Sequence, residues 1–235
     1  MNGSTKRVRQ SKLVVFFDVD NTLLNNDRIS ADLNAHLKRE VGPQRSRFYW
    51  AIFEKLRGQL GYADYLGSLQ GFRRDFPHDL ELLWVPRFLI DYPFSKRLYA
   101  RSLDVIRHFK RLARVVLLSD GDVVFQPHKV ERSGLYRAVD GQALIYVHKE
   151  RELADVEARF PAAHYVVVDD KLRILAAIKK VWKSRVTTVF VRQGHYALDP
   201  EITARYPSAD ETVQNIGDLL KLNLRTFRPR RLRND

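Results

Sequence analysis

The chain has 235 residues, of which 45% are hydrophobic and 29% charged, a composition that excludes disordered and collagen-like proteins. It contains no cysteine, so disulfides, thiolate metal sites and cysteine nucleophiles are excluded. No apolar run approaches the roughly 18 residues that a membrane-spanning helix needs, and no signal-like apolar region lies near Met1. We therefore expect a cytoplasmic protein with no membrane partner.

The formal net charge of +13 is concentrated at the two ends of the chain. Residues 1–12 contribute +4 and residues 221–235 contribute +5, which leaves +4 for residues 13–220. Basic ends of this kind are typical of solvated segments. We predict flexible tails at residues 1–12 and 223–235 and expect no nucleic-acid partner.

Five short apolar runs predict the strands of a buried sheet. They are continuously apolar and rich in β-branched or aromatic residues, which is typical of strands covered on both faces. Segments with helical spacing lie between the later runs, and this alternation predicts a doubly wound, Rossmann-like α/β fold with a parallel sheet. The predicted strands are residues 13–17, 115–118, 143–147, 165–168 and 186–191.

The first interval between strands is too long for one crossover. It holds 92 residues between Thr22 and Val115, whereas a parallel crossover needs about a dozen. Leu33, Leu37 and Val41 recur at helical spacing within it. We predict a small inserted α-helical cap at residues 30–93, connected through residues 25–29 and 91–95. The α/β core then comprises residues 13–29 and 94–222.

Polar residues follow four of the five predicted strands. In a parallel sheet these strand ends meet at one edge, where α/β folds place their ligand crevice. The residues are Asp18 and Asp20 after the first strand, Ser119, Asp120 and Gly121 after the second, Lys149 after the third, and Asp169 and Asp170 after the fourth.

The carboxylates in this set predict a metal site. Asp18, Asp20, Asp169 and Asp170 against the single Lys149 leave a charge of −3, which a crevice of low dielectric holds only with a cation or with proton uptake. Oxygen ligands without cysteine favour Mg²⁺ over zinc.

Such a set of residues suits phosphoryl transfer. A carboxylate beside Mg²⁺ can attack phosphorus, and a second carboxyl two residues on can protonate the leaving oxygen and then deprotonate water. We expect Ser119 and the backbone N–H groups of Asp120 and Gly121 to bind the transferring phosphate, with Lys149 neutralising its charge.

In order along the chain, these motifs resemble those of the haloacid dehalogenase superfamily with an α-helical cap after motif I. The matching residues are Asp18-Val19-Asp20-Asn21-Thr22-Leu23-Leu24 as motif I, Leu117-Leu118-Ser119 as motif II, Lys149 as motif III and Asp169-Asp170 as motif IV. Asn21 replaces the glycine that is most common at its place. The resemblance implies that Asp18 is the nucleophile and Asp20 the general acid/base. It also implies that the Asp18 carboxylate, the Asp20 backbone carbonyl and Asp170 hold Mg²⁺, with Asp169 in or next to the shell.

The resemblance favours a Mg²⁺-dependent phosphatase that hydrolyses a small-molecule phosphate ester through an aspartyl phosphate. The dehalogenases that give the superfamily its name lack the second carboxylate of motif I, so Asp20 argues for phosphoryl chemistry. A phosphomutase or phosphotransferase would use the same residues. In a different class, a non-catalytic metal-containing protein could bind a polyanion through its basic tails.

Several other residues are assigned to structure. Lys129, with Asp122 and His128, is placed in the helix after motif II, and Trp50, Tyr62 and Tyr65 in the cap core. The loop 192–195 is either part of the crevice or an ordinary surface loop. The cap has nine basic and eight acidic residues, and this net charge of +1 predicts no strongly anionic leaving group.

Overall fold

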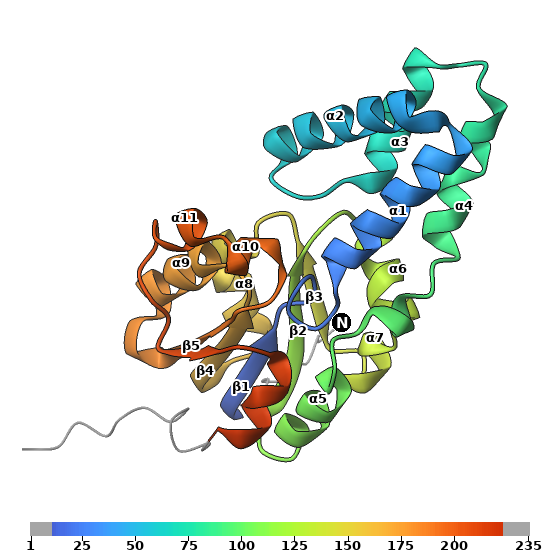
Figure 1. Cartoon of the computed structure of the whole chain (residues 1–235). Coiled ribbons are helices and arrows are strands. Elements are labelled where there is room, and N and C mark those ends of the chain that lie inside the picture. Colours follow the sequence, from blue (N-terminus) through green and yellow to red (C-terminus); the bar gives the residue numbers. More distant parts are fainter. Residues whose placement is uncertain (1–10, 223–235) are drawn as a thin grey trace, which may run out of the picture.

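The computed structural model describes residues 11–222, which form a six-stranded parallel sheet with helices on both faces (Figure 1). The strand order is β3-β2-β1-β4-β5-β6, which confirms the doubly wound α/β fold predicted from the sequence. The strands are β1 (Ser11–Phe17), β2 (Arg114–Asp120), β3 (Ala143–Tyr146), β4 (Ala162–Asp169), β5 (Val186–Val191) and β6 (Glu211–Val213).

All five predicted strands are present, and the sheet has one more. β6 has the sequence Glu-Thr-Val and pairs with β5 at the edge of the sheet. Only Val213 of its three residues is buried. A short, mainly polar edge strand carries no run of apolar residues, so the sequence pattern did not reveal it.

The central strand β1 supplies side chains to two separate cores. Val15 and Phe17 pack in the core on one face, and Val14 and Phe16 in the core on the other. This alternation follows from the two-residue period of a strand. Because both faces are buried, the run is apolar throughout.

Two sets of helices cover these faces. α5 (Ser102–Lys110) joins the first core, whereas α8 (Leu153–Arg159) and α9 (Leu172–Trp182) join the second. The other helical elements of the core are η2 (Phe94–Arg97), α6 (Phe125–Arg132), α7 (Leu135–Ala138), η3 (Lys149–Arg151), η4 (Lys183–Arg185), α10 (Gly194–Leu198), α11 (Pro200–Thr203) and η5 (Ile216–Lys221).

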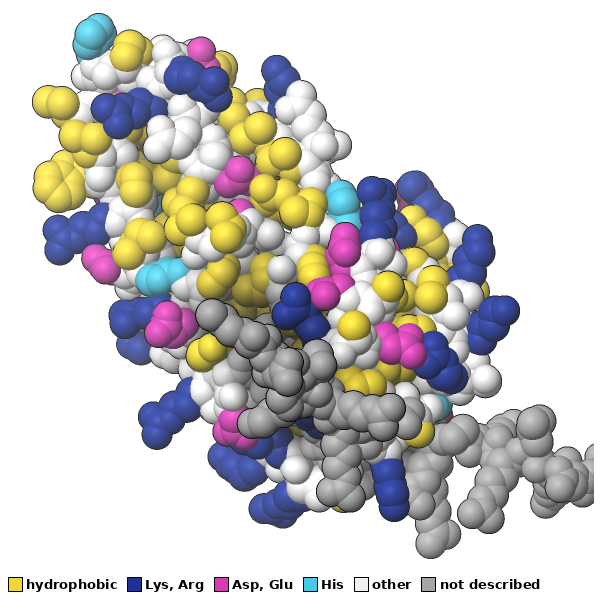
Figure 2. Space-filling view, turned by 180° about the vertical axis from the view of Figure 1, so that it is seen from behind, with side chains coloured by type: hydrophobic (Ala, Val, Ile, Leu, Met, Phe, Trp, Pro, Cys, Tyr) yellow, Lys and Arg dark blue, Asp and Glu magenta, His cyan; other side chains and the backbone are white. Residues whose placement is uncertain are grey.

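The long insertion forms a layer of helices beyond the carboxyl ends of the strands (Figure 1). Its elements are α1 (Asn26–Glu40), α2 (Gly42–Leu60), α3 (Tyr65–Asp75), η1 (Leu80–Leu83) and α4 (Val85–Ile90). We call residues 26–90 the cap. Hydrophobic side chains gather over it on the face shown in Figure 2, and Leu80, Leu83 and Trp84 are exposed around η1.

The cap begins earlier than its predicted boundary at residue 30. Asn25 caps α1 by accepting a hydrogen bond from the Arg28 N–H, so residues 26–29 are already its first turn. Leu24 and Leu98 form an antiparallel bridge, and the Asn25 N–H donates to the Arg97 carbonyl. The chain therefore enters and leaves the cap side by side.

The predicted tails lie almost entirely outside the described residues. Residues 1–10 and 223–235 are not described, and Ser11 and Lys12 of the predicted N-terminal tail belong to β1. Among residues 11–222, no helix has the length and apolarity to cross a membrane.

Candidate active site

Three aspartates meet where the adjacent strands β1 and β4 end. Asp18 directly follows β1, Asp169 ends β4, and Asp170 is the next residue. β1 and β4 are paired in register, so one carboxylate oxygen of each aspartate lies within 4.8 Å of the others, and all three residues are buried. The predicted convergence of these residues is present in the structure.

The chemistry of this cluster fits a hard divalent cation. Asp18 Oδ2 and both carboxylate oxygens of Asp170 are buried and have no hydrogen-bond partner among the described residues. Burial raises the pKa of Asp170 well above its ordinary value and that of Asp169 to about 6. Buried carboxylates with free oxygens are ligands that Mg²⁺ accepts, so Asp18, Asp169 and Asp170 would hold the ion.

Lys149 bridges two of the aspartates. Its Nζ lies 2.5 Å from Asp18 Oδ1 and 2.7 Å from Asp169 Oδ2, and it donates to the Leu118 carbonyl at 3.2 Å. Burial alone would lower the pKa of Lys149, but Asp169 and Asp18 hold it well above the ordinary value. The lysine is therefore a fixed cation beside Asp18.

The Asp120 carboxylate helps to hold Lys149 in place. It accepts a hydrogen bond of 2.7 Å from the Lys149 backbone N–H, and its burial raises its pKa. The nearby Gly121 N–H donates to the Tyr146 carbonyl at 2.9 Å. Phosphate binding by Gly121, as predicted from the sequence, would require this bond to be exchanged.

Ser119 is buried at the end of β2. Its Oγ accepts a hydrogen bond of 2.9 Å from Gln126 Nε2 of α6. Asp122 Oδ1 accepts hydrogen bonds from the N–H groups of Val124 and Phe125, where α6 begins. Ser119 is thus held on the carboxyl edge of the sheet, where the resemblance places a phosphate ligand.

The sequence analysis missed a second buried lysine of the site. Lys129 of α6 is 1% exposed, and its Nζ donates to Asp20 Oδ2 at 2.7 Å and to Asn26 Oδ1 at 3.2 Å. The sequence pattern alone places it in a structural helix. The available signal was the polar pair Gln126 and Lys129, which lies at i, i+3 between apolar Phe125 and Val130 and therefore on the inward side of the helix.

The backbone conformation and hydrogen bonds of Asn21 explain why asparagine can replace the glycine that is most common at this place. Its φ is 59°, a left-handed conformation that asparagine tolerates better than most residues. Its Oδ1 accepts from the N–H groups of Asn26 and Asp27, which begin α1. On its other side, a Cβ on Gly194 would lie 2.5 Å from the Asn21 Cβ, so this loop requires glycine.

The complete set of charges balances one divalent ion. The site contains five aspartates, which are Asp18, Asp20, Asp120, Asp169 and Asp170. Three lysines face them, because Lys171 lies there together with Lys129 and Lys149. Burial would lower the pKa of Lys171, but Asp170 and its neighbours raise it. The net charge is −2 when all groups are ionised, in place of the −3 counted from the sequence.

A cavity of about 930 Å³ lies between this edge of the sheet and the cap. Asp20, Asp120 and Gly121 line it from the core, and Trp50, Tyr62 and Tyr65 line it from the cap. These three aromatic residues are therefore more than cap core. The loop 192–195 also belongs to the crevice, because His195 lines the cavity and its Nδ1 lies 2.6 Å from Asp27 Oδ1.

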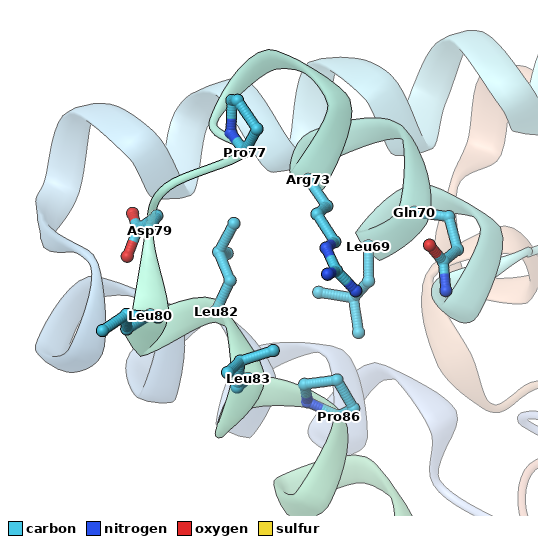
Figure 3. Close-up of a pocket in the computed structure, with 9 residues that line it drawn as sticks. All are labelled: Leu69, Gln70, Arg73, Pro77, Asp79, Leu80, Leu82, Leu83 and Pro86. Atoms are coloured by element: carbon cyan, nitrogen blue, oxygen red, sulfur yellow. The ribbon is translucent and has the colours of Figure 1, made fainter.

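A separate cavity of about 110 Å³ lies inside the cap (Figure 3). Leu69 and Arg73 of α3 line it together with Leu82 and Leu83 of η1. None of the strand-end residues reaches it. The larger cavity, which Asp20, Asp120 and Gly121 line, is therefore the one that adjoins the strand ends.

Similarity to a solved structure identifies the family of this chain. That solved protein is described as a haloacid dehalogenase-like hydrolase from Burkholderia xenovorans. The present chain is 55% identical to it over 92% of this chain and 98% of that one, with a TM-score of 0.88. The present chain belongs to the haloacid dehalogenase-like hydrolases. This confirms the resemblance drawn from the motifs at Asp18, Ser119, Lys149 and Asp169.

More distant solved structures of haloacid dehalogenase-like proteins share the fold. A hydrolase of this superfamily from Bacillus subtilis, bound to magnesium, is 14% identical over 91% of this chain and 98% of that one, with a TM-score of 0.60. A defluorinating L-2-haloacid dehalogenase is 15% identical over 89% and 94%, with a TM-score of 0.58. No family model matches the chain, and no curated protein does.

Proposed function

We propose that this haloacid dehalogenase-like hydrolase is a Mg²⁺-dependent phosphatase that acts on a small-molecule phosphomonoester. The observation that carries the proposal is the position of the Asp20 side chain. It follows Asp18 by two residues, lines the large cavity, and is held by Lys129. The nucleophile is thus followed, two residues on, by a second carboxyl that lines the large cavity.

Each residue of the site has its own role in the proposed reaction. An Asp18 carboxylate oxygen attacks phosphorus, and the bond to the ester oxygen breaks while Asp20 gives that oxygen a proton. Asp20 then takes a proton from water, which attacks phosphorus and frees Asp18. Lys149, at 2.5 Å from Asp18 Oδ1, stabilises the negative charge of the transferring group. Mg²⁺, held by Asp18, Asp169 and Asp170, would supply a positive charge that orients and polarises the phosphate.

The same argument disfavours a dehalogenase. A halide ion leaves without being protonated, so displacement of a halide by Asp18 needs no general acid beside it. An alkoxide leaving group is a strong base and does need one. The Asp20 carboxyl therefore favours an ester bond over a carbon–halogen bond as the bond that is broken.

The test is a panel of substrates assayed with the full chain. We expect hydrolysis of 4-nitrophenyl phosphate and of alkyl phosphates with Mg²⁺, loss of activity in excess EDTA, and recovery on adding Mg²⁺ back. L-2-Chloropropionate is the matching dehalogenase substrate. Halide release without phosphate release would overturn the proposal.

Two variants locate the reaction at the site. Asp18→Asn should abolish phosphate release, because an amide cannot form the acyl phosphate, while the protein stays folded. Asp104→Asn is the matched control, since Asp104 is a half-exposed residue of α5 that pairs with Arg107. Phosphate release by Asp18→Asn at the parent rate would show that Asp18 is not the nucleophile.

A further inference from the structure

The large cavity has room for a sizeable leaving group. Its volume of about 930 Å³ is at the upper end of the roughly 300–1,000 Å³ that is typical of small-molecule sites. A lone phosphate or a short-chain ester would fill a small part of it. The remainder is shaped by side chains from both the cap and the core.

Aromatic rings form part of this remaining space. Tyr62 comes from the cap, and Tyr206 follows α11 of the core. Both side chains are partly buried, and neither ring makes a ring-stacking or cation–π contact with another described residue, although Tyr206 also packs against the second core. Tyr196, in contrast, is engaged, because Arg57 donates to its hydroxyl at 2.8 Å and Lys171 lies over its ring at 5.0 Å.

The arginines that line the cavity differ in their partners. Arg57 forms an ion pair with Glu54 at 2.7 Å, and Arg173 forms one with Glu150 at 2.6 Å. Arg151 and Arg205 are exposed, and their side chains make no ion pair or hydrogen bond with any described residue. Free guanidinium groups bind carboxylates and phosphates through paired hydrogen bonds.

The carboxylates of the cavity do not compensate these two charges. Asp20 is bound by Lys129 and Asp27 by His195, and Asp120 accepts from the Lys149 backbone N–H. Glu54 and Glu150 already hold the other two arginines. The reacting phosphate does not compensate them either, because it belongs beside the buried pair Asp18 and Lys149. Two positive charges therefore remain for another part of the ligand.

We propose that the substrate is a phosphomonoester whose leaving group contains a ring and a second anionic group, bound by Arg151 and Arg205. This inference rests on the proposed phosphatase function and specifies its substrate class. The prediction of no strongly anionic leaving group counted residues 30–93 alone. Arg151 and Arg205 belong to the core, more than 50 residues further along the chain, and reach the same cavity through the fold.

The test compares esters that differ only in the second charge. In the first pair, 4-(carboxymethyl)phenyl phosphate adds a carboxylate to phenyl phosphate, and the two leaving groups have nearly equal acidity. In the second pair, adenosine 3′,5′-bisphosphate adds a phosphate to adenosine 5′-monophosphate. In each pair, we expect kcat/KM to be about tenfold higher for the ester that carries the second anionic group. The gain should come mainly from a lower KM and is what one charge-assisted contact provides. The pair with the larger ratio identifies carboxylate or phosphate as the second group.

Variants connect this preference to the two arginines. Arg151→Gln and Arg205→Gln, singly and together, should reduce the ratio toward one by lowering kcat/KM for the ester that carries the second anionic group. Arg132→Gln is the matched control, because Arg132 is exposed on α6, its side chain has no hydrogen-bond or ion-pair partner within residues 11–222, and it lies outside the cavity. Equal kcat/KM within both pairs, or a ratio that survives in the double variant, would overturn the inference. If none of the four esters were hydrolysed, the phosphatase assignment would be overturned, and this inference with it.

Discussion

Lys129 Nζ lies 2.7 Å from Asp20 Oδ2 and joins α6 to the loop that follows β1. The same ammonium group donates to Asn26 Oδ1 at 3.2 Å, and Asn26 is the first residue of the cap. One buried cation therefore holds both the proposed general acid and the start of α1. This makes Lys129 a positioning residue for the reaction.

Replacing Lys129 should affect esters according to their leaving groups. Lys129→Met frees the Asp20 carboxyl from its partner, so we expect kcat on an alkyl phosphate to fall about 10²-fold, within the range that general acid catalysis supplies. Nitrophenolate needs little protonation, so the first step with 4-nitrophenyl phosphate should be affected less. Single-turnover kinetics on both esters measure this difference.

The control for this variant is Lys179→Met. Lys179 pairs with Asp210 on the surface, with its Nζ 2.7 Å from Asp210 Oδ2, and neither residue lines the large cavity. It should change neither ester's rate. Equal losses on both esters in Lys129→Met, without rescue by Lys129→Arg, would assign Lys129 to structure alone.

The stabilising effect of Mg²⁺ should depend on pH. Burial raises the pKa of Asp169 to about 6 and also raises that of Asp170, so the metal-free native state binds more protons than the unfolded chain between about pH 4 and pH 6. The stability contributed by these groups is present at low pH and is lost as the pH rises through 6. Mg²⁺ replaces the protons only where the carboxylates are ionised.

Thermal unfolding with and without Mg²⁺ measures this linkage. We expect a clear rise in Tm on adding Mg²⁺ at pH 7.5 and little change at pH 5. In Asp170→Asn the rise at pH 7.5 should be much reduced, because one ligand is lost. A rise of the same size at both pH values would show that the ion binds elsewhere.

Two tryptophans should differ strongly in their contribution to stability. Trp182 is 2% exposed and stacks on Tyr165 with ring centroids 4.2 Å apart, whereas Trp84 in the cap is 58% exposed. Trp182→Ala should lower the free energy of unfolding by about 3–5 kcal/mol, and Trp84→Ala should change it by no more than about 0.5 kcal/mol. Urea denaturation curves compare the two, and similar losses would contradict the burial difference.

Much of the fold follows from residue patterns that have a physical cause. Strands buried on both faces must be apolar throughout, so runs such as residues 186–191 are visible in the sequence. The edge strand β6 is half exposed and carries no such pattern. The cap boundary was displaced because Asn25 caps α1, and the side chain that begins a helix sits outside its apolar repeat.

The site was predictable where the backbone alone positions a residue. Asp18, Ser119 and Asp169 follow or end parallel strands, and the topology of the sheet brings strand ends together. Lys129 reaches the site through a long side chain from a helix, and Arg151 and Arg205 reach the cavity from separate elements. Such approaches depend on how helices pack on the sheet, which spacing along one segment does not encode.

The central claim is that Asp18 becomes phosphorylated, and mass spectrometry of the trapped enzyme tests it most directly. In Asp20→Asn the water that releases Asp18 lacks its base, so the intermediate should accumulate when the variant is mixed with 4-nitrophenyl phosphate and Mg²⁺. After an acid quench and proteolysis, we predict the mass of one phosphoryl group on the peptide that contains Asp18, and its absence from the same peptide of Asp18→Asn. A burst of nitrophenolate from Asp20→Asn with no phosphoryl group on Asp18, or with one on another residue, would contradict the account.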